Sequence, residues 1–154
     1  MPGTSNYEPY APNAQGFTEV LIDLKSTLAG KTIYSVGGFL AEAFENIPQG
    51  SALYSRTSDG KVGLAVANDT FDKANVVGFA ETGKLSGEQV RVLIVGVLPT
   101  TGLTLGSIYY LSAGTPGLIL SAPPSTAGHY VTRVGEASSS TQLILQLEPP
   151  IQLH

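Results

Sequence analysis

Apolar positions along this chain fall in short runs, each followed by residues that favour turns. In the C-terminal part the runs cover residues 108–111, 118–120, 130–137 and 142–147. Aromatic and β-branched residues fill these runs, as is typical of β-strands. The intervening Gly114-Thr115-Pro116-Gly117, Pro123-Pro124 and Ser138-Ser139-Ser140 are turn signals, because proline fixes φ and glycine supplies the positive φ of a tight turn. Four short strands separated by turns predict an antiparallel β meander.

The chain carries this pattern twice. Gly50-Ser51-Ala52-Leu53-Tyr54 aligns with Gly106-Ser107-Ile108-Tyr109-Tyr110, and Asp59-Gly60-Lys61-Val62 aligns with Pro116-Gly117-Leu118-Ile119. Val77-Gly78-Phe79-Ala80 aligns with Val134-Gly135-Glu136-Ala137, and residues 89–94 align with 142–147. The separation between aligned positions is nearly constant, which is the mark of an internal repeat rather than of chance similarity between strands. We therefore predict two related meanders, residues 50–94 and 106–147, with Gly78 and Gly135 at equivalent places.

Residues 1–16 differ from the rest, with three prolines, two glycines, two tyrosines and no periodicity. This composition is typical of an extended arm that lies on a partner. We predict that Tyr7 and Tyr10 anchor the arm, with Pro12 and Phe17 completing the partner-binding residues. A single β domain is expected over residues 17–154. In its first part, residues 17–24 and 31–36 are strand candidates, and residues 39–44 fit either a strand or a helical turn.

Composition narrows the class of protein. The 154 residues are 42% hydrophobic and only 13% charged, about half the usual charged share. So few charges, together with aliphatic strands such as Leu143-Ile144-Leu145 that we expect to be exposed, indicate that part of the surface is covered by other molecules. The net charge of −4 disfavours a nucleic-acid partner, and cysteine is absent. No apolar run reaches the ~18 residues of a membrane span, and the first residues lack a signal-peptide pattern, so we expect assembly in a cytoplasm.

Candidate chemistry is sparse. His129 and His154 have no neighbours typical of a catalytic triad or a metal site, and Asp69 with Asp72 lacks the alternating ligands of a calcium loop. The other acidic and hydroxyl candidates are Glu81, Glu88, Glu136 and Ser138–Ser140. The three glutamates would need the fold to bring them together, and the serines read as a turn. We predict that the chain is not an enzyme and uses no cofactor or metal.

A longer ordered pattern runs through the second copy. It comprises Gly102-Leu103-Thr104, Gly106-Ser107, Tyr109-Tyr110-Leu111-Ser112, Thr115-Pro116-Gly117, Pro124-Ser125-Thr126 with Gly128, and Val134-Gly135 with Ala137-Ser138. This pattern is similar to a β module of tailed-bacteriophage virion proteins. The first copy resembles capsid decoration (cement) proteins and the ends of some tail or head fibres. The resemblance covers residues 50–148 and implies a structural, non-enzymatic role and a homotrimer.

Together these observations predict an all-β fold, either a compact antiparallel β-barrel or a sandwich, built from two related meanders with an extended N-terminal arm. The expected function is decoration of a phage capsid, where the protein would bridge subunits of the major capsid protein on the virion surface. The alternative is a fibre or spike domain that binds a host receptor or glycan. A glycan-cleaving enzyme would require two carboxylates about 5–9.5 Å apart in a groove.

Overall fold

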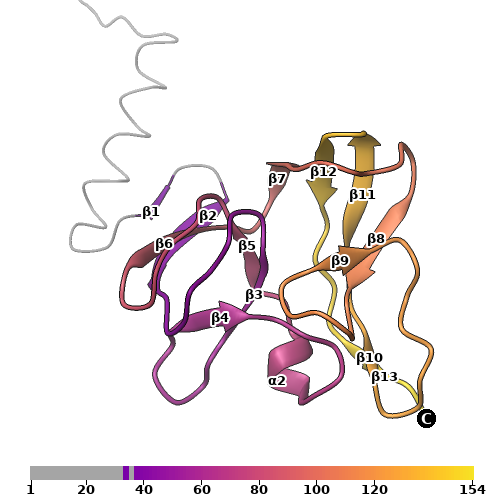
Figure 1. Cartoon of the computed structure of the whole chain (residues 1–154), viewed down its shortest axis with the longest axis horizontal. Coiled ribbons are helices and arrows are strands. Elements are labelled where there is room, and N and C mark those ends of the chain that lie inside the picture. The colour runs from indigo at the N-terminus through magenta and orange to yellow at the C-terminus, as the bar shows by residue number, and fades with distance from the viewer. Residues whose placement is uncertain (1–32, 35–36) are drawn as a thin grey trace, which may run out of the picture. The chain divides into compact units, whose positions relative to one another are not determined.

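The computed structural model describes residues 33–34 and 37–154 (Figure 1). The chain divides into two units, Met1–Ser35 and Val36–His154. In the first unit the described part is strand β1 (Ile33–Tyr34), which lies within the predicted strand 31–36. The predicted arm, the strand candidate 17–24 and the candidate residues Tyr7, Tyr10, Pro12 and Phe17 lie outside the described residues.

The unit Val36–His154 is built almost wholly of antiparallel strands, so the predicted all-β class is confirmed. Its first sheet has the order β2 (Gly38–Glu42), β6 (Gln89–Leu93), β5 (Gly78–Ala80), β3 (Ala52–Ser55) and β4 (Val62–Leu64). The second has the order β7 (Gly96–Pro99), β12 (Gln142–Leu145), β11 (Arg133–Ser139), β8 (Ile108–Leu111) and β9 (Ile119–Leu120). A small sheet pairs β10 (Tyr130–Val131) with β13 (Ile151–Gln152). Residues 39–44, which fitted either a strand or a helical turn, lie largely in strand β2.

The two large sheets have the same strand order when β2 is matched to β7, β3 to β8, β4 to β9, β5 to β11 and β6 to β12. Registers agree as well. Gly78 lies opposite Leu53, and Gly135 lies opposite Tyr109, the residue that aligns with Leu53 in the sequence. The amide of Gly50 donates to the Ala80 carbonyl at 2.8 Å, and the amide of Gly106 donates to the Ala137 carbonyl at 2.8 Å. The match also includes β2 and β7, so it begins earlier in the chain than the predicted residue 50.

Both glycines on the central strands sit where a side chain has no room. A Cβ atom at Gly78 would lie 2.6 Å from the Leu93 carbonyl oxygen and against the Val92 side chain. A Cβ atom at Gly135 would lie against the Ile144 carbonyl oxygen and 3.2 Å from Leu143 Cγ. The strand that follows each glycine strand therefore approaches it equally closely in the two copies, and this close approach explains why the Val-Gly-x-Ala motif recurs.

The strand order differs from a simple meander, in which each strand pairs with the next. In each copy the strand that follows the hairpin pairs with the first strand of that hairpin. In the first copy β3 therefore lies between β4 and β5, and in the second copy β8 lies between β9 and β11. The connections that make this return are long enough to hold structure of their own: helix α2 (Phe71–Ala74) in the first copy and β10 in the second. Turn signals in the sequence mark where strands end, but they do not say which strand is the neighbour.

The sheets are open, so of the two predicted architectures the closed barrel is not observed. The first sheet curls furthest: a single parallel bridge between Ala43 and Val62 brings β4 next to the end of β2. Inside this curl lies a small core with Leu53, Val90 and Val92 fully buried. The alternating pattern of β12 explains the equivalent packing in the second sheet, where Leu143 and Leu145 are buried and the residues beside them are exposed.

A larger apolar core joins the two copies, with Tyr54 and Phe79 from the first and Leu98, Leu111 and Leu143 from the second among its members. Main-chain hydrogen bonds hold this junction together. The Ala52 amide donates to the Gly117 carbonyl at 2.9 Å, and the Gly117 amide donates to the Ala65 carbonyl at 2.7 Å. The fully buried Thr132 hydroxyl also donates to the Ala74 carbonyl, at 2.8 Å. Polar backbone groups at the junction are thus satisfied, as burial requires.

Candidate binding surfaces

An exposed row of side chains crosses the outer face of the second sheet. Ile144 on β12 lies opposite Val97 on β7 on one side and opposite Glu136 on β11 on the other, and Glu136 lies opposite Ile108 on β8. Val97 is 47% exposed and Ile144 is 42% exposed. We call Val97, Ile144, Glu136 and Ile108 the outer row. Cross-strand neighbours on one face stand about 5 Å apart, so the aliphatic members form a strip interrupted by one carboxylate.

The same face carries a second row, in which Arg133 lies opposite Tyr110 and Tyr110 lies opposite the exposed Leu120. The Arg133 guanidinium donates to the Gln146 side chain at 3.1 Å and lies 3.8 Å from the Glu148 carboxylate. Arg133 Nε is buried and has no hydrogen-bond partner. This face therefore combines apolar side chains with an arginine whose donors are only partly used.

A groove runs between the two copies. It consists of two adjoining pockets of about 330 and 350 Å³ that share Gln49, Gly50, Thr100 and Thr101. The 330 Å³ pocket continues along the turn and edge strand of the second copy to Ile119. Every residue that lines these two pockets is uncharged. The groove is therefore suited to main-chain or neutral polar groups, and its lining contributes no charged side chain.

The hairpin of the first copy carries an ordered cluster of charged and aromatic side chains. Arg56 lies with its guanidinium carbon 4.1 Å above the centre of the Phe44 ring, and the Phe44 and Tyr54 rings meet edge to face. Arg56 also donates to Asp59, with the closest ion-pair atoms 2.6 Å apart. The hydrogen bond from Arg56 and a second one from the Lys61 amide lower the pKa of Asp59 to about 2. These contacts fix the hairpin rather than create a reactive group.

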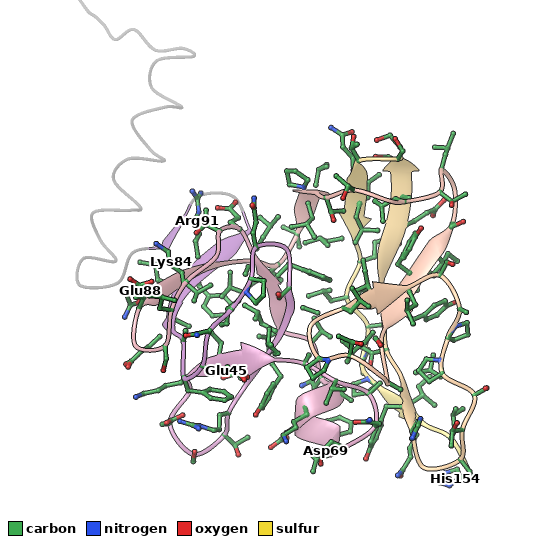
Figure 2. All side chains as sticks on the ribbon, in the orientation of Figure 1. Glu45, Asp69, Lys84, Glu88, Arg91 and His154 are labelled. Carbon is green, nitrogen blue, oxygen red and sulfur yellow. The ribbon has the colours of Figure 1, made fainter. Side chains whose placement is uncertain are left out.

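Three of the residues considered for chemistry, Asp69, Glu88 and His154, lie apart from one another (Figure 2). Asp69 pairs with Lys73 at 2.7 Å beside helix α2, whose first turn is capped by Thr70. Asp72 contacts Thr57 at 3.3 Å.

Two of the glutamates also have local partners. Glu81 pairs with Arg91 at 3.0 Å, and Glu88 accepts a hydrogen bond from the Leu85 amide at 2.8 Å. Glu136 lies apart from them, on the outer face of the second sheet.

His129 is half-buried and His154 is exposed, while Ser138 and Ser139 belong to the end of β11. Within the described part of the chain, no three His, Asp or Glu side chains gather as a metal site would require.

One feature of these surfaces differs from the expectation based on the sequence, and a second, the groove, was not predicted. The run Leu143-Ile144-Leu145 was expected to be exposed as a whole, but Leu143 and Leu145 are buried and only Ile144 faces outward. The error comes from reading an apolar run without its period, because alternate residues of a strand point to opposite faces. The groove was missed because it depends on how the two copies pack, which no local pattern records.

No protein-family model matches the chain, and no curated protein sequence matches it significantly.

Among the described residues, no helix is both long enough and apolar enough to cross a membrane.

Proposed function

We propose that the chain is a structural protein of a tailed-phage virion, a homotrimer that decorates the capsid and bridges subunits of the major capsid protein. The observation that carries this proposal is the outer row, where Val97 and Ile144 stand side by side and half exposed on a regular sheet. Clustered apolar side chains on a protein surface mark an interaction site. The resemblance of residues 50–148 to phage virion modules supplies the identity of the assembly and the number three.

The outer row supports contact between copies of the chain. Full burial of an aliphatic side chain contributes about 1.5–3 kcal/mol, so burying the exposed halves of Val97 and Ile144 contributes about 1 kcal/mol each. Glu136 limits the geometry of the contact, because a buried carboxylate without a partner is costly. A neighbouring copy must therefore place a cation against Glu136 or leave it at the wet rim of the interface. This requirement gives the contact a defined register.

Capsid attachment is assigned to the N-terminal arm, residues 1–16. A buried tyrosine brings a large apolar face and one polar tip, which suits Tyr7 and Tyr10 to the role of anchors. Ordering the arm costs about 1–2 kcal/mol of backbone entropy per fixed residue, which the anchors and strand-like hydrogen bonds must offset. Because a trimer would carry three arms, weak single contacts sum to firm attachment. Such contacts across subunit boundaries would reinforce the shell.

The groove favours a second candidate, a fibre or spike domain that binds a host receptor or glycan. Its lining is neutral and contributes hydroxyl and amide groups from Gln49, Ser51, Thr100, Thr101 and Thr115. Such groups can hydrogen-bond a neutral sugar. The outer row has no part in this alternative, which is why decoration of the capsid is preferred.

The two candidates place the protein at different virion addresses, and fractionation tests this directly. Particles of the phage that encodes the chain are disrupted, DNA-filled heads are separated from tails on a density gradient, and each fraction is probed for the chain. Decoration predicts recovery with heads, at a constant ratio to the major capsid protein. Recovery with tails alone would refute decoration and support the fibre.

A further inference from the structure

The first copy closes the side of its sheet that the second copy leaves open. Just after β2, the Phe44 amide donates to the Val62 carbonyl at 3.0 Å, next to the parallel bridge between Ala43 and Val62. The Phe44 ring packs directly on Gly63, and a carboxylate oxygen of Glu45 accepts from the Leu64 amide at 2.8 Å. Three successive residues, 43 to 45, thus cover the free edge of β4 with the chain's own backbone and side chains.

In the second copy the equivalent positions are known from the register. The Ala43 amide donates to the Glu88 carbonyl at 2.9 Å, and the Thr100 amide donates to the Thr141 carbonyl at 2.9 Å. Thr101 therefore corresponds to Phe44, and Ile119 corresponds to Val62. In the described part of the chain no hydrogen bond joins Thr101 to Ile119, and both residues line the groove instead.

The sequence explains why the second copy stays open. Thr101 and Gly102 replace Phe44 and Glu45, so neither the aromatic ring nor the capping carboxylate is present. Leu120 replaces Gly63, so the flat backbone on which the Phe44 ring lies in the first copy is missing. The closing contacts are thus absent at every one of these positions.

The open edge offers main-chain hydrogen bonds to an extended peptide. The amide of Leu111 donates to the Thr132 carbonyl at 3.0 Å, so Leu111 and Ile119, which lie opposite each other, are not a hydrogen-bonded pair of the β8–β9 ladder. In such a pair the main-chain polar groups face away from the partner strand, so the amide and carbonyl of Ile119 point away from β8. Thr101 lines the same groove. A strand inserted between them would pair with both, as peptides do when they add to a sheet edge.

We propose that this groove binds residues 11–16 of a neighbouring copy as an extended strand. The segment, Ala11-Pro12-Asn13-Ala14-Gln15-Gly16, is uncharged throughout and so matches the uncharged lining. Asn13, Ala14 and Gln15 are three successive residues with backbone amides, as pairing on both sides of an inserted strand requires. The inference rests on the proposed function for the presence of neighbouring copies. It leaves Tyr7 and Tyr10 to reach the capsid, while the part of the arm that follows them binds the neighbouring copy of the trimer.

Disulfide trapping tests the proposal on the full chain, which has no cysteine of its own. The double variant A14C/T101C is oxidised mildly and run on a non-reducing gel. Insertion into a neighbour's groove predicts covalent dimers and trimers, formed at least tenfold faster than in the control A14C/S58C, whose second cysteine lies in the exposed hairpin turn of the first copy. A monomer closed by an internal disulfide would overturn the choice of a neighbouring copy, and equal rates in both variants would overturn the site.

A third variant separates strand pairing from mere proximity. Adding N13P to A14C/T101C removes one amide next to the trapped residue and leaves the two cysteines unchanged. Strand pairing predicts that trapping slows several-fold, whereas an unchanged rate would refute it. Light scattering on the same samples distinguishes a failure of this inference from a failure of the proposed homotrimer. Trimers without trapping contradict this inference alone, and monomers contradict the proposed homotrimer itself.

Discussion

Replacing the two equivalent glycines tests whether the copies are built alike. An alanine Cβ at Gly135 meets the Ile144 carbonyl oxygen, and at Gly78 it lies 2.6 Å from the Leu93 carbonyl oxygen. Both obstacles are backbone atoms of the neighbouring strand, so relief requires moving the ladder. Overpacking a core typically costs 1–3 kcal/mol, and contact with backbone belongs at the upper end, so we expect about 3 kcal/mol for each of G78A and G135A. Gly114 provides the control, because a Cβ there would have only Ser112 Oγ within 4 Å, at 3.9 Å, and its φ is not positive.

The assay is thermal or urea unfolding of the wild type, G78A, G135A and G114A. With about 4 °C per kcal/mol for a domain of this size, the first two variants should lower Tm by about 12 °C. G114A should change stability by no more than about 0.5 kcal/mol, because it creates no close contact. A loss below about 1 kcal/mol in either G78A or G135A, or an equal loss in G114A, would refute the close strand approach described for the two copies.

Three further predictions concern the junction, the hairpin and the outer row. T132V leaves the buried Ala74 carbonyl without its donor and should lower the free energy of unfolding in urea by about 1–3 kcal/mol. T132S keeps the hydroxyl and should lower it by only about 1 kcal/mol, for the lost methyl group. Equal losses in the two variants would contradict the role of the hydrogen bond. Arg56 lowers the pKa of Asp59 to about 2, so this carboxylate contributes stability above pH ~4 that is lost as pH falls through 2. Over that pH range Tm should therefore fall less in D59N than in the wild type. Parallel curves of Tm against pH would contradict this. Because Ile144 is half exposed in the outer row, I144S should shift the proposed trimer toward monomers in light scattering, with an unchanged Tm of the isolated domain. A wild type that is monomeric at micromolar concentration would count against the proposed interface.

Local sequence patterns located most of the strands of the two copies and their kinship, but they did not predict β7 or β13. The repeated Val-Gly-x-Ala motif marks the crowded position on each central strand, whereas the apolar run of β12 did not reveal which of its residues are buried. They were insufficient for strand order and closure. The contact of Phe44 with Gly63 joins residues far apart in sequence, and only the register shows that Thr101 and Leu120 stand in their places. A binding groove that arises from such a missing contact has no motif of its own.

The arm is the part of the account on which attachment depends, and its effects on folding and on binding should separate. Deleting residues 1–16 should leave the β domain folded with only a small change in Tm, because the cores described above consist of residues beyond Gly37. Binding to the capsid should suffer in the same variant. Replacing Tyr7 and Tyr10 with alanine should have an intermediate effect, since the backbone of the arm remains while its anchors are lost.

Occupancy on purified capsids tests the proposed decoration most directly. Capsids stripped of the chain are incubated with the full-length protein, with Y7A/Y10A and with the variant lacking residues 1–16, and bound protein is counted per capsid subunit. Capsid decoration through the arm predicts a fixed, saturable ratio for the full-length protein, a clear reduction for Y7A/Y10A and the lowest occupancy for the deletion. Equal occupancy of all three would assign docking to the β domain instead of the arm, and no saturable binding by the full-length protein would contradict the proposed function.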